Sequence, residues 1–311
     1  MKVLITGGAG FIGSHLADRL LDEGHEVLVI DNYSTGRRDN LDERDGLTIV
    51  DDTIDDPRAV EQGFASFGPD FVVHAAASYK DPDAWAADVA TNALGTVNVV
   101  KATEAAGVER LLYFQTALCY GTTPEEQPVT LSHPIRPDSS YAISKTAGEQ
   151  YIEMSGLDFV SFRLANAYGP RNISGPLPTF FQRLTEGKSV FVMDTRRDFI
   201  YVDDLVDVVM QAVVDGKGHG HYHVSSGADF SIKELFDATI AALPEVQLED
   251  EVEVRPRGED DAYTILLDPS RVREDFGWEP KTPLEEGVRR AIEYYRERGI
   301  SQTYTHLRLG E

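Results

Sequence analysis

The sequence predicts an α/β fold, with a Rossmann-type doubly wound parallel sheet and a smaller α/β C-terminal substrate domain. Two observations lead to this prediction. Short apolar runs alternate with helical patterns over residues 2–115, which is typical of a parallel sheet with right-handed crossovers. The first apolar run ends in a glycine-rich turn that opens a helix and leads to a second strand, as in dinucleotide-binding folds.

The first strand–turn–helix unit carries the clearest local signal. We expect strands over Lys2–Thr6 and Glu26–Ile30, with a helix over Ser14–Glu23 between them. Glycines permit a tight turn and close backbone approach, and the helix N-terminus offers N–H groups to a pyrophosphate. The turn itself reads Gly7-Gly8-Ala9-Gly10-Phe11-Ile12-Gly13.

Asp31 closes the second strand, 18 residues after Gly13. Its carboxylate would accept hydrogen bonds from an adenosine ribose and repel a 2′-phosphate, so the sequence favours NAD over NADP. Arg37 and Arg38 leave NADP as an alternative.

The alternation continues through the first half of the chain. The expected strands are Leu47–Val50, Phe71–His74 and Leu111–Gln115, and the expected helices begin near Pro57 and cover Trp85–Ala106. Ligands bind at the carboxyl ends of parallel strands, and Thr116 lies at such an end. Small residues at positions 75–77 would let a cofactor lie against the backbone, whereas we interpret His74 as structural.

Tyr141 and Lys145 are the predicted chemical centre. Residues four apart on a helix share a face, so the phenol and the ammonium can point into one site. An ammonium beside a phenol favours the phenolate and lowers the pKa of the tyrosine. A general base near neutral pH requires such tuning.

Composition excludes several classes of protein. The net charge of −24, from 53 acidic and 29 basic residues, argues against a nucleic-acid or anionic-membrane partner. Cys119 is the only cysteine, which excludes an internal disulfide and cysteine-based zinc sites and fits a cytoplasmic protein. We expect neither a signal peptide nor a transmembrane helix.

The C-terminal half has fewer patterns. We expect helices opening near Gly175, over Ser231–Ala242 with an N-terminal capping box, and over Pro283–Arg298. Arg196 and Arg197 form the basic cluster that an anionic ligand of an acidic protein requires. We do not expect the histidines at 219, 221 and 223 to bind a metal together, because they are divided between a turn and a strand.

With these residues in hand, the chain resembles the extended short-chain dehydrogenase/reductase superfamily. Within it, the chain is similar to the NAD-dependent nucleotide-sugar epimerase/dehydratase family, which includes UDP-galactose 4-epimerase, and especially to epimerase-like proteins of bacterial surface-polysaccharide clusters. The segments that carry the resemblance beyond the glycine turn and Asp31 are 116–121, 141–145, 163–170 and 197–204.

The resemblance implies residue roles. Thr116 would hydrogen-bond the 4-hydroxyl of the sugar, Tyr141 would take its proton, and Lys145 would lower the tyrosine pKa and hold the nicotinamide ribose. The implied substrate-binding residues are Lys80, Thr116, Asn166, Arg197 and Arg257, with Arg255 as the alternative to Arg257. The implied cofactor-binding residues are Gly7, Gly10, Phe11, Ile12, Gly13, Asp31, Asn32, Thr53, Ile54, Ala75, Ala76, Tyr141 and Lys145.

The chain departs from the family pattern at Thr53, where an aspartate commonly contacts adenine, and this weakens the expected adenine contact. The resemblance also implies a dinucleotide-binding domain over 1–165, with return segments near 198–228, and a nucleotide-sugar-binding domain over 166–311. Two helices, those following Trp85 and Tyr141, are expected to pair across a homodimer.

The two residues after Thr116 decide between branches of the family. The 4,6-dehydratases carry an Asp-Glu pair there, and the decarboxylases generally carry a glutamate nearby, whereas Ala117 and Leu118 have no proton to exchange. The sequence therefore favours a 4-epimerase that oxidises carbon 4 transiently with tightly bound NAD and returns the hydride to the other face. A dehydratase or decarboxylase, a 4-keto-sugar reductase and a non-enzymatic dinucleotide sensor remain alternatives.

UDP is the expected nucleotide, because it is the commonest in the family. In the family a bulky tyrosine near the sugar excludes N-acetyl groups, and the matching position here is Ile265, which leaves more room. The expected substrates are therefore a UDP-hexose, a UDP-N-acetylhexosamine or a UDP-uronate. We interpret Cys119 as a packing residue.

Overall fold

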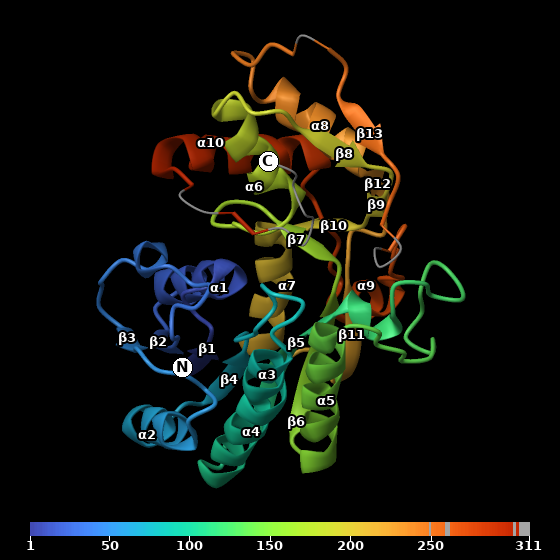
Figure 1. Cartoon of the computed structure of the whole chain (residues 1–311). Helices are drawn as coiled ribbons and strands as arrows, with labels where there is room; N and C mark the ends of the chain where they lie inside the picture. Colours follow the sequence, from blue (N-terminus) through green and yellow to red (C-terminus); the bar gives the residue numbers. More distant parts are fainter. Residues whose placement is uncertain (249, 259–261, 301–302, 305–311) are drawn as a thin grey trace.

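Seven parallel strands form the central sheet, in the order β11-β6-β5-β4-β1-β2-β3 (Figure 1). The computed structural model describes residues 1–248, 250–258, 262–300 and 303–304. It confirms the predicted doubly wound fold. The strands are β1 Lys2–Thr6, β2 Glu26–Ile30, β3 Leu47–Val50, β4 Phe71–His74, β5 Arg110–Thr116, β6 Asp158–Leu164 and β11 Gly220–Val224.

The strand order reverses beside β1, which pairs with β2 on one side and with β4 on the other. In open α/β sheets a ligand binds at this switch point, outside the carboxyl ends of the strands. These ends face the C-terminal half of the chain (Figure 1). The glycine turn follows β1 and therefore lies at the switch point.

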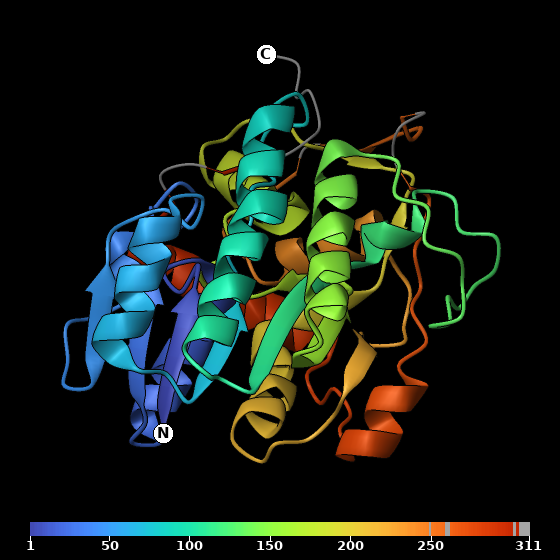
Figure 2. The same ribbon diagram turned by 90° about the horizontal axis from the view of Figure 1, so that it is seen from below.

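Helices cover both faces of the sheet (Figure 2). One face carries α1 (Phe11–Asp22) and α7 (Val202–Val213), which pack on each other. The other carries α2 (Pro57–Phe67), α4 (Thr96–Ala105) and α5 (Ser140–Ser155) side by side. Both α7 and β11 come from the second half of the chain and return to the sheet.

The segment predicted as one helix over Trp85–Ala106 is three consecutive pieces. A short α3 (Trp85–Asp88) leads into η2, a π-helical stretch over Val89–Gly95, and then into α4. The Thr96 hydroxyl donates to the Asn92 carbonyl at 2.6 Å, the acceptor that the Thr96 N–H would use in a regular α-helix. Such π-helical turns concentrate at functional sites.

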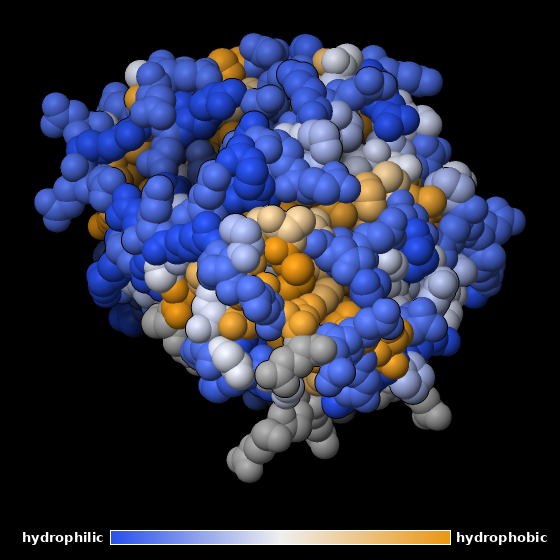
Figure 3. Space-filling model, turned by 90° about the horizontal axis from the view of Figure 1, so that it is seen from above, coloured by the Kyte–Doolittle hydropathy of each residue, from blue (hydrophilic) through white to orange (hydrophobic). Residues whose placement is uncertain are grey.

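The C-terminal half stacks three helices above the strand ends. They are α6 (Pro176–Thr185), α8 (Ile232–Ala241) and α10 (Leu284–Arg298), and they pack on one another. The predicted capping box of α8 is confirmed, because Ser231 and Glu234 bond each other's backbone. Seen from above, this half is mostly hydrophilic, with one hydrophobic patch toward the centre (Figure 3).

Short strands join the C-terminal half in pairs, and one more helix returns to the main sheet. α9 (Ser270–Phe276) packs against β11. The 3₁₀ turn η1 (Arg38–Asn40) comes after β2, and the 3₁₀ turn η3 (Ala117–Tyr120) directly follows β5. The pairs are β7 (Asn166–Tyr168) with β10 (Phe199–Tyr201), β9 (Arg196–Arg197) with β12 (Phe230–Ser231), and β8 (Phe191–Met193) with β13 (Glu253–Arg255).

Within the described part of the chain, no helix has the length and apolar character needed to cross a membrane.

Candidate active site

The turn after β1 brings backbone close to backbone. Gly7 has a φ of 71°, and a Cβ added there would lie 2.6 Å from the backbone of Ala76. A Cβ on Gly13 would lie 2.3 Å from the Gly7 carbonyl oxygen. Helix α1 begins at Phe11, and its N-cap Gly10 supplies no side-chain cap. The first N–H groups of α1 are therefore open to an anion, and the turn fits a dinucleotide pyrophosphate.

Asp31 lies beside this turn, as predicted. Its Oδ2 accepts a hydrogen bond from Ala9 N at 2.9 Å, and its Oδ1 accepts one from Tyr33 N at 2.8 Å. Burial raises the pKa of Asp31, and these backbone hydrogen bonds oppose the rise. The remaining lone pairs of a carboxylate can still accept from ribose hydroxyls.

The two arginines that would favour NADP are held by carboxylates. Arg37 pairs with Asp39 at 2.6 Å, and Arg38 pairs with Asp51 and stacks over the Tyr33 ring at 4.0 Å. Because both guanidinium groups are paired with carboxylates, the arrangement does not favour binding of the 2′-phosphate of NADP. The other predicted cofactor residues, Asn32, Thr53, Ile54 and Ala75, follow the ends of β2, β3 and β4 and so share this edge of the sheet.

Thr116 and Tyr141 are brought together. Thr116 ends β5, and Tyr141 lies in the first turn of α5, whose N-cap Ser139 accepts from Ala142 N at 3.3 Å. The Thr116 hydroxyl lies near enough to the Tyr141 phenol to lower the pKa of that phenol. The loop after β4 reaches the same place, because the rings of Tyr79 and Tyr141 meet edge-on at 6.4 Å.

Lys145 is buried one helical turn further along α5. Its Nζ lies 3.9 Å from the centre of the Tyr113 ring, and its side chain is 2% exposed. Burial lowers the pKa of Lys145 to about 7, and the negative charge of Glu149 opposes that shift. At neutral pH the amine therefore carries only part of a charge.

The pKa of Tyr141 differs from the expectation. Burial raises this pKa well above its usual value, electrostatic interactions with Tyr79 and with Asp88 raise it further, and the Thr116 hydroxyl opposes the rise. Lys145 is not among these causes. Tyr141 therefore stays protonated at neutral pH, and a positive charge beside its ring would favour the phenolate.

His74 is structural, as interpreted from the sequence. Its Nδ1 lies 2.7 Å from Thr6 Oγ1 and its Nε2 lies 2.8 Å from Thr96 Oγ1. Because the Thr96 hydroxyl donates to Asn92, Nε2 must carry the proton and Nδ1 must accept. Burial and then Lys145 lower the pKa of His74 to about 3, so the ring is neutral.

Asn166 and Arg197 lie across from the catalytic side chains, in the C-terminal half. Asn166 opens β7, is exposed, and donates from Nδ2 to the Asp198 carbonyl at 3.2 Å. Arg197 is half-buried and donates to the Ala262 carbonyl at 2.9 Å. The predicted roles of Asn166 and Arg197 in substrate binding stay predictions.

The second basic candidate lies after β13. Arg255 pairs with Glu253 at 2.7 Å and stacks over Phe191 at 3.8 Å, whereas Arg257 is exposed two residues later. The preference for Arg257 over Arg255 stays a prediction. Ile265 is 7% exposed and packs within the core, and its position near the sugar stays a prediction.

Lys80 does not point at the catalytic tyrosine. Its Nζ donates to the Ser34 carbonyl and lies 4.3 Å from the centre of the Tyr304 ring. It therefore links the loops after β4 and β2 to the C-terminal segment. Its predicted role in substrate binding stays a prediction.

The residues after Thr116 carry no acid or base, as the sequence shows. Ala117 is buried, Leu118 is half-buried, and both form the η3 turn. Cys119 is fully buried, and burial raises the pKa of its thiol to about 12. It is therefore the packing residue that we predicted.

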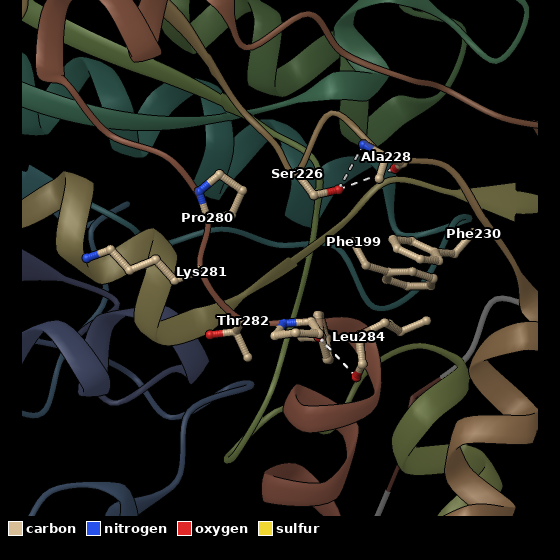
Figure 4. Close-up of a pocket in the computed structure, with 10 residues that line it drawn as sticks. Phe199, Ser226, Ala228, Phe230, Pro280, Lys281, Thr282 and Leu284 are labelled. Atoms are coloured by element: carbon tan, nitrogen blue, oxygen red, sulfur yellow. Dashed lines mark hydrogen bonds between the residues drawn. The ribbon is translucent and has the colours of Figure 1, made fainter.

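A cavity of about 240 Å³ lies in the C-terminal half, away from the catalytic side chains (Figure 4). Phe199 and Phe230 line it on one side, and Lys281 and Thr282 lie at the approach to α10. None of the predicted site residues lines it. It belongs to the packing between β10, β12 and α10 rather than to the catalytic centre.

The three histidines of β11 and its preceding turn have separate partners. His219 bonds Asp158 at 2.6 Å, His221 approaches Glu153 at 2.8 Å, and His223 bonds Tyr120 at 2.7 Å. Glu149, Glu153 and His221 have oxygen and nitrogen atoms within 4.8 Å of one another. The carboxylate of Glu149 is already paired with Arg163 at 2.9 Å, however.

Sequence reasoning missed three residues around Tyr141. Tyr79 stands next to the predicted Lys80, but nothing in the sequence shows that its ring meets Tyr141. Asp88 and Asn92 lie in the segment that was read as a plain helix. A mid-helix asparagine was the available signal, because asparagine favours local side-chain-to-backbone bonds over helix interiors.

Comparisons with known proteins agree with this geometry. The model of the NAD dependent epimerase/dehydratase family matches residues 3–225. A UDP-glucose 4-epimerase of Mycolicibacterium smegmatis is 34% identical over 96% of this chain and 99% of its own length.

Two solved structures from Bordetella bronchiseptica are similar over nearly the whole chain. The enzyme WbmH in complex with NAD+ is 55% identical, with a TM-score of 0.93 over 96% of this chain and 99% of that one. The enzyme WbmG in complex with NAD and UDP is 44% identical, with a TM-score of 0.91 over 99% of each chain.

Proposed function

The chain belongs to the NAD dependent epimerase/dehydratase family, and from this premise we propose that it is a nucleotide-sugar 4-epimerase that uses NAD. One observation carries the choice of reaction. Thr116 ends β5 and Tyr141 begins α5 with Lys145 one helical turn further along, while Ala117 and Leu118 beside Thr116 have no ionisable group. The site can move a proton at carbon 4 but cannot eliminate water.

NAD is the cofactor, and its place follows from the glycine turn. The open N–H groups of Phe11, Ile12 and Gly13 at the start of α1 would hold the pyrophosphate, and Asp31 would bind the adenosine ribose. Residues after β2, β3 and β4 would line the adenine and ribose side. The relative WbmG, solved in complex with NAD and UDP, supports NAD as the cofactor.

Acid–base chemistry falls to three side chains. When bound, NAD would supply hydride transfer to and from carbon 4 of the sugar. Thr116 would hydrogen-bond the 4-hydroxyl, and Tyr141 would take its proton. Because burial keeps the Tyr141 phenol protonated by itself, Tyr141 becomes a base only beside a positive charge. Lys145 and the oxidised nicotinamide are the candidates for that charge.

The substrate is a UDP-sugar in this proposal, either a UDP-hexose, a UDP-N-acetylhexosamine or a UDP-uronate. Arg197 would bind the diphosphate, with Arg257 as a second cation, and Asn166 and Lys80 would complete the site. Local arginines are required because the net charge of −24 repels an anion at a distance. UDP bound in WbmG and the name of the mycobacterial relative support the choice of nucleotide.

We also propose that two copies of the chain pair through α3, η2 and α5. These elements lie side by side (Figure 2) and expose Trp85 (66%), Val89 (56%), Ile143 (54%) and Met154 (76%). Exposed apolar side chains gathered on neighbouring helices are typical of an interface. The domain division at residues 165/166 and the cytoplasmic location stay predictions.

Tyr141→Phe tests the assignment of the base. Removing the hydroxyl leaves no group to take the proton, so turnover of the UDP-sugar should fall by at least 100-fold, a loss on the order of that for a general base. Bound NAD, measured after release from the purified protein, should stay at the wild-type amount. Tyr151→Phe is the matched control, since Tyr151 is an exposed tyrosine on the same helix. Wild-type turnover in Tyr141→Phe would refute the assignment.

A further inference from the structure

Asp88 is a buried carboxylate that the mechanism above does not use. It is the last residue of α3 and is 1% exposed. Its Oδ1 accepts from Ser78 Oγ at 2.9 Å, and its Oδ2 accepts from Ser140 Oγ at 2.7 Å. Among the described residues these two hydroxyls are its side-chain partners, and none of the cations pairs with it. A buried carboxylate without a cation is costly, so its presence calls for a reason.

Both serines precede a tyrosine of the site. Ser78 comes directly before Tyr79 in the loop after β4, and Ser140 comes directly before Tyr141 at the start of α5. The rings of these tyrosines meet at 6.4 Å with an interplanar angle of 66°. The Asp88 carboxylate thus hydrogen-bonds the residue that precedes each of these two tyrosines.

Asn92 makes a parallel connection one turn further along. Its Oδ1 accepts from Ser78 N at 2.8 Å, and its Nδ2 donates to the Ser78 carbonyl at 2.9 Å and to Ser144 Oγ at 3.0 Å. Ser144 in turn donates to the Tyr141 carbonyl at 2.9 Å. Ser78 is therefore held at its amide, its carbonyl and its hydroxyl, and Tyr141 is flanked by two tethered serines.

We propose that Asp88 is a positioning residue for Tyr141: through Ser78 and Ser140 it sets the approach of the Tyr79 loop to α5 and so the orientation of the catalytic phenol. The inference rests on the proposed function of Tyr141 as the base. Asp88 itself touches neither the sugar nor the cofactor in this account. Its contribution is geometric and, through its charge, electrostatic.

The charge of Asp88 has a definite sign at Tyr141. Burial is the main cause of the raised pKa of Tyr141; Tyr79 and Asp88 add to it, and the Thr116 hydroxyl opposes it. Lys145 lies on the same helix, and Tyr113 packs behind it on β5. A negative charge nearby disfavours a phenolate, so removing the charge of Asp88 should lower the pKa of Tyr141.

Three variants of the full-length protein separate position from charge. Ser140→Ala removes one tether and keeps the charge, Asp88→Asn removes the charge and keeps the size and one acceptor oxygen, and Asp88→Ala removes the charge and both tethers. We expect kcat to fall about tenfold in Ser140→Ala and further in Asp88→Ala, with KM for the UDP-sugar within about twofold of wild type, since misplacement by a fraction of an ångström suffices. Asp83→Asn is the matched control, because Asp83 is an exposed carboxylate of the same segment.

Titration of Tyr141 provides a readout that does not depend on turnover. The protein with its bound NAD is produced with fluorinated tyrosine, which lowers the phenol pKa into a range where the fold is stable. The Tyr141 resonance in the fluorine NMR spectrum is the one that Tyr141→Phe removes. Asp88→Asn should move its titration midpoint to lower pH, whereas Ser140→Ala and Asp83→Asn should leave the midpoint in place.

The outcomes distinguish the two proposals. If wild type converts no nucleotide sugar but Asp88→Asn still shifts the Tyr141 midpoint downward, the proposed function fails and the electrostatic link to Tyr141 stands. An unchanged midpoint in Asp88→Asn overturns the electrostatic part. Wild-type kcat in Asp88→Ala and Ser140→Ala overturns the positioning role. Thermal unfolding and NAD content of each variant establish that it folds, and Asp88→Asn remains informative if Asp88→Ala does not.

Discussion

Lys145 and Tyr113 are joined twice. The ammonium nitrogen of Lys145 lies 3.9 Å from the centre of the Tyr113 ring, and the Tyr113 hydroxyl donates to the Lys145 carbonyl oxygen at 2.9 Å. One fully buried tyrosine of β5 thus fixes the backbone of α5 and provides a cation–π contact for its lysine. The ring stabilises the ammonium less than water would, so burial still lowers the pKa of Lys145.

The buried lysine predicts how stability depends on pH. The pKa of Lys145 falls from its ordinary value of 10.5 to about 7 in the folded protein. Between these values the unfolded chain binds the extra proton, so the free energy of unfolding rises with pH. Wild type should gain about 2 kcal/mol more than Lys145→Met between pH 7 and pH 9.

Denaturant unfolding at the two pH values checks this prediction. Lys101→Met is the control, because Lys101 is an exposed lysine in a surface ion pair and should behave as wild type. An equal gain in wild type and Lys145→Met would show that Lys145 keeps an ordinary pKa.

Gly13→Ala should disrupt the nucleotide-binding turn. The added Cβ would lie 2.3 Å from the Gly7 carbonyl oxygen, which is closer than real Cβ contacts allow. We expect a loss of about 1–3 kcal/mol in stability, as for overpacked sites, and loss of bound NAD. Gly258→Ala is the control, since a Cβ there meets no atom within 4 Å. Full NAD content in Gly13→Ala would contradict the assignment of the turn.

The sheet and the nucleotide-binding edge were predictable because their signals are local. A strand, a glycine turn, a helix and an acid at fixed spacing leave few alternatives, and β1, β2 and β4 lie over the predicted residues. Thr116 and Tyr141 were also placed together correctly, since each stands at an element end that faces the same edge.

What the sequence could not predict depends on packing between distant segments. The π-helical stretch over Val89–Gly95, which ends where Thr96 bonds the Asn92 carbonyl, is not visible in the helical periodicity of the sequence. The expected lowering of the Tyr141 pKa by Lys145 considered spacing alone. Burial, which the spacing of residues does not reveal, raises the pKa of Tyr141 instead. The Lys145 amine lies over the Tyr113 ring.

Met154→Glu should weaken the proposed dimer. Met154 is 76% exposed on α5, and an interface that covered it would have to bury the new charge, which is costly. Light scattering of the purified protein should give twice the chain mass for wild type and the chain mass for the variant. Val214→Glu, at the end of α7 on the opposite face of the sheet, should leave the dimer intact. A wild-type protein with the mass of one chain, 34.4 kDa, would refute the pairing.

Proton NMR of the purified protein with UDP-sugars that carry deuterium on carbon 4, without added NAD, tests the central claim most directly. Panels of dTDP-, GDP- and CDP-sugars extend the test to other nucleotides. The account predicts conversion of a UDP-sugar to its 4-epimer with the deuterium retained on carbon 4, because the hydride returns within the site. Formation of a 4-keto-6-deoxy sugar, or exchange of the deuterium with solvent, would contradict it.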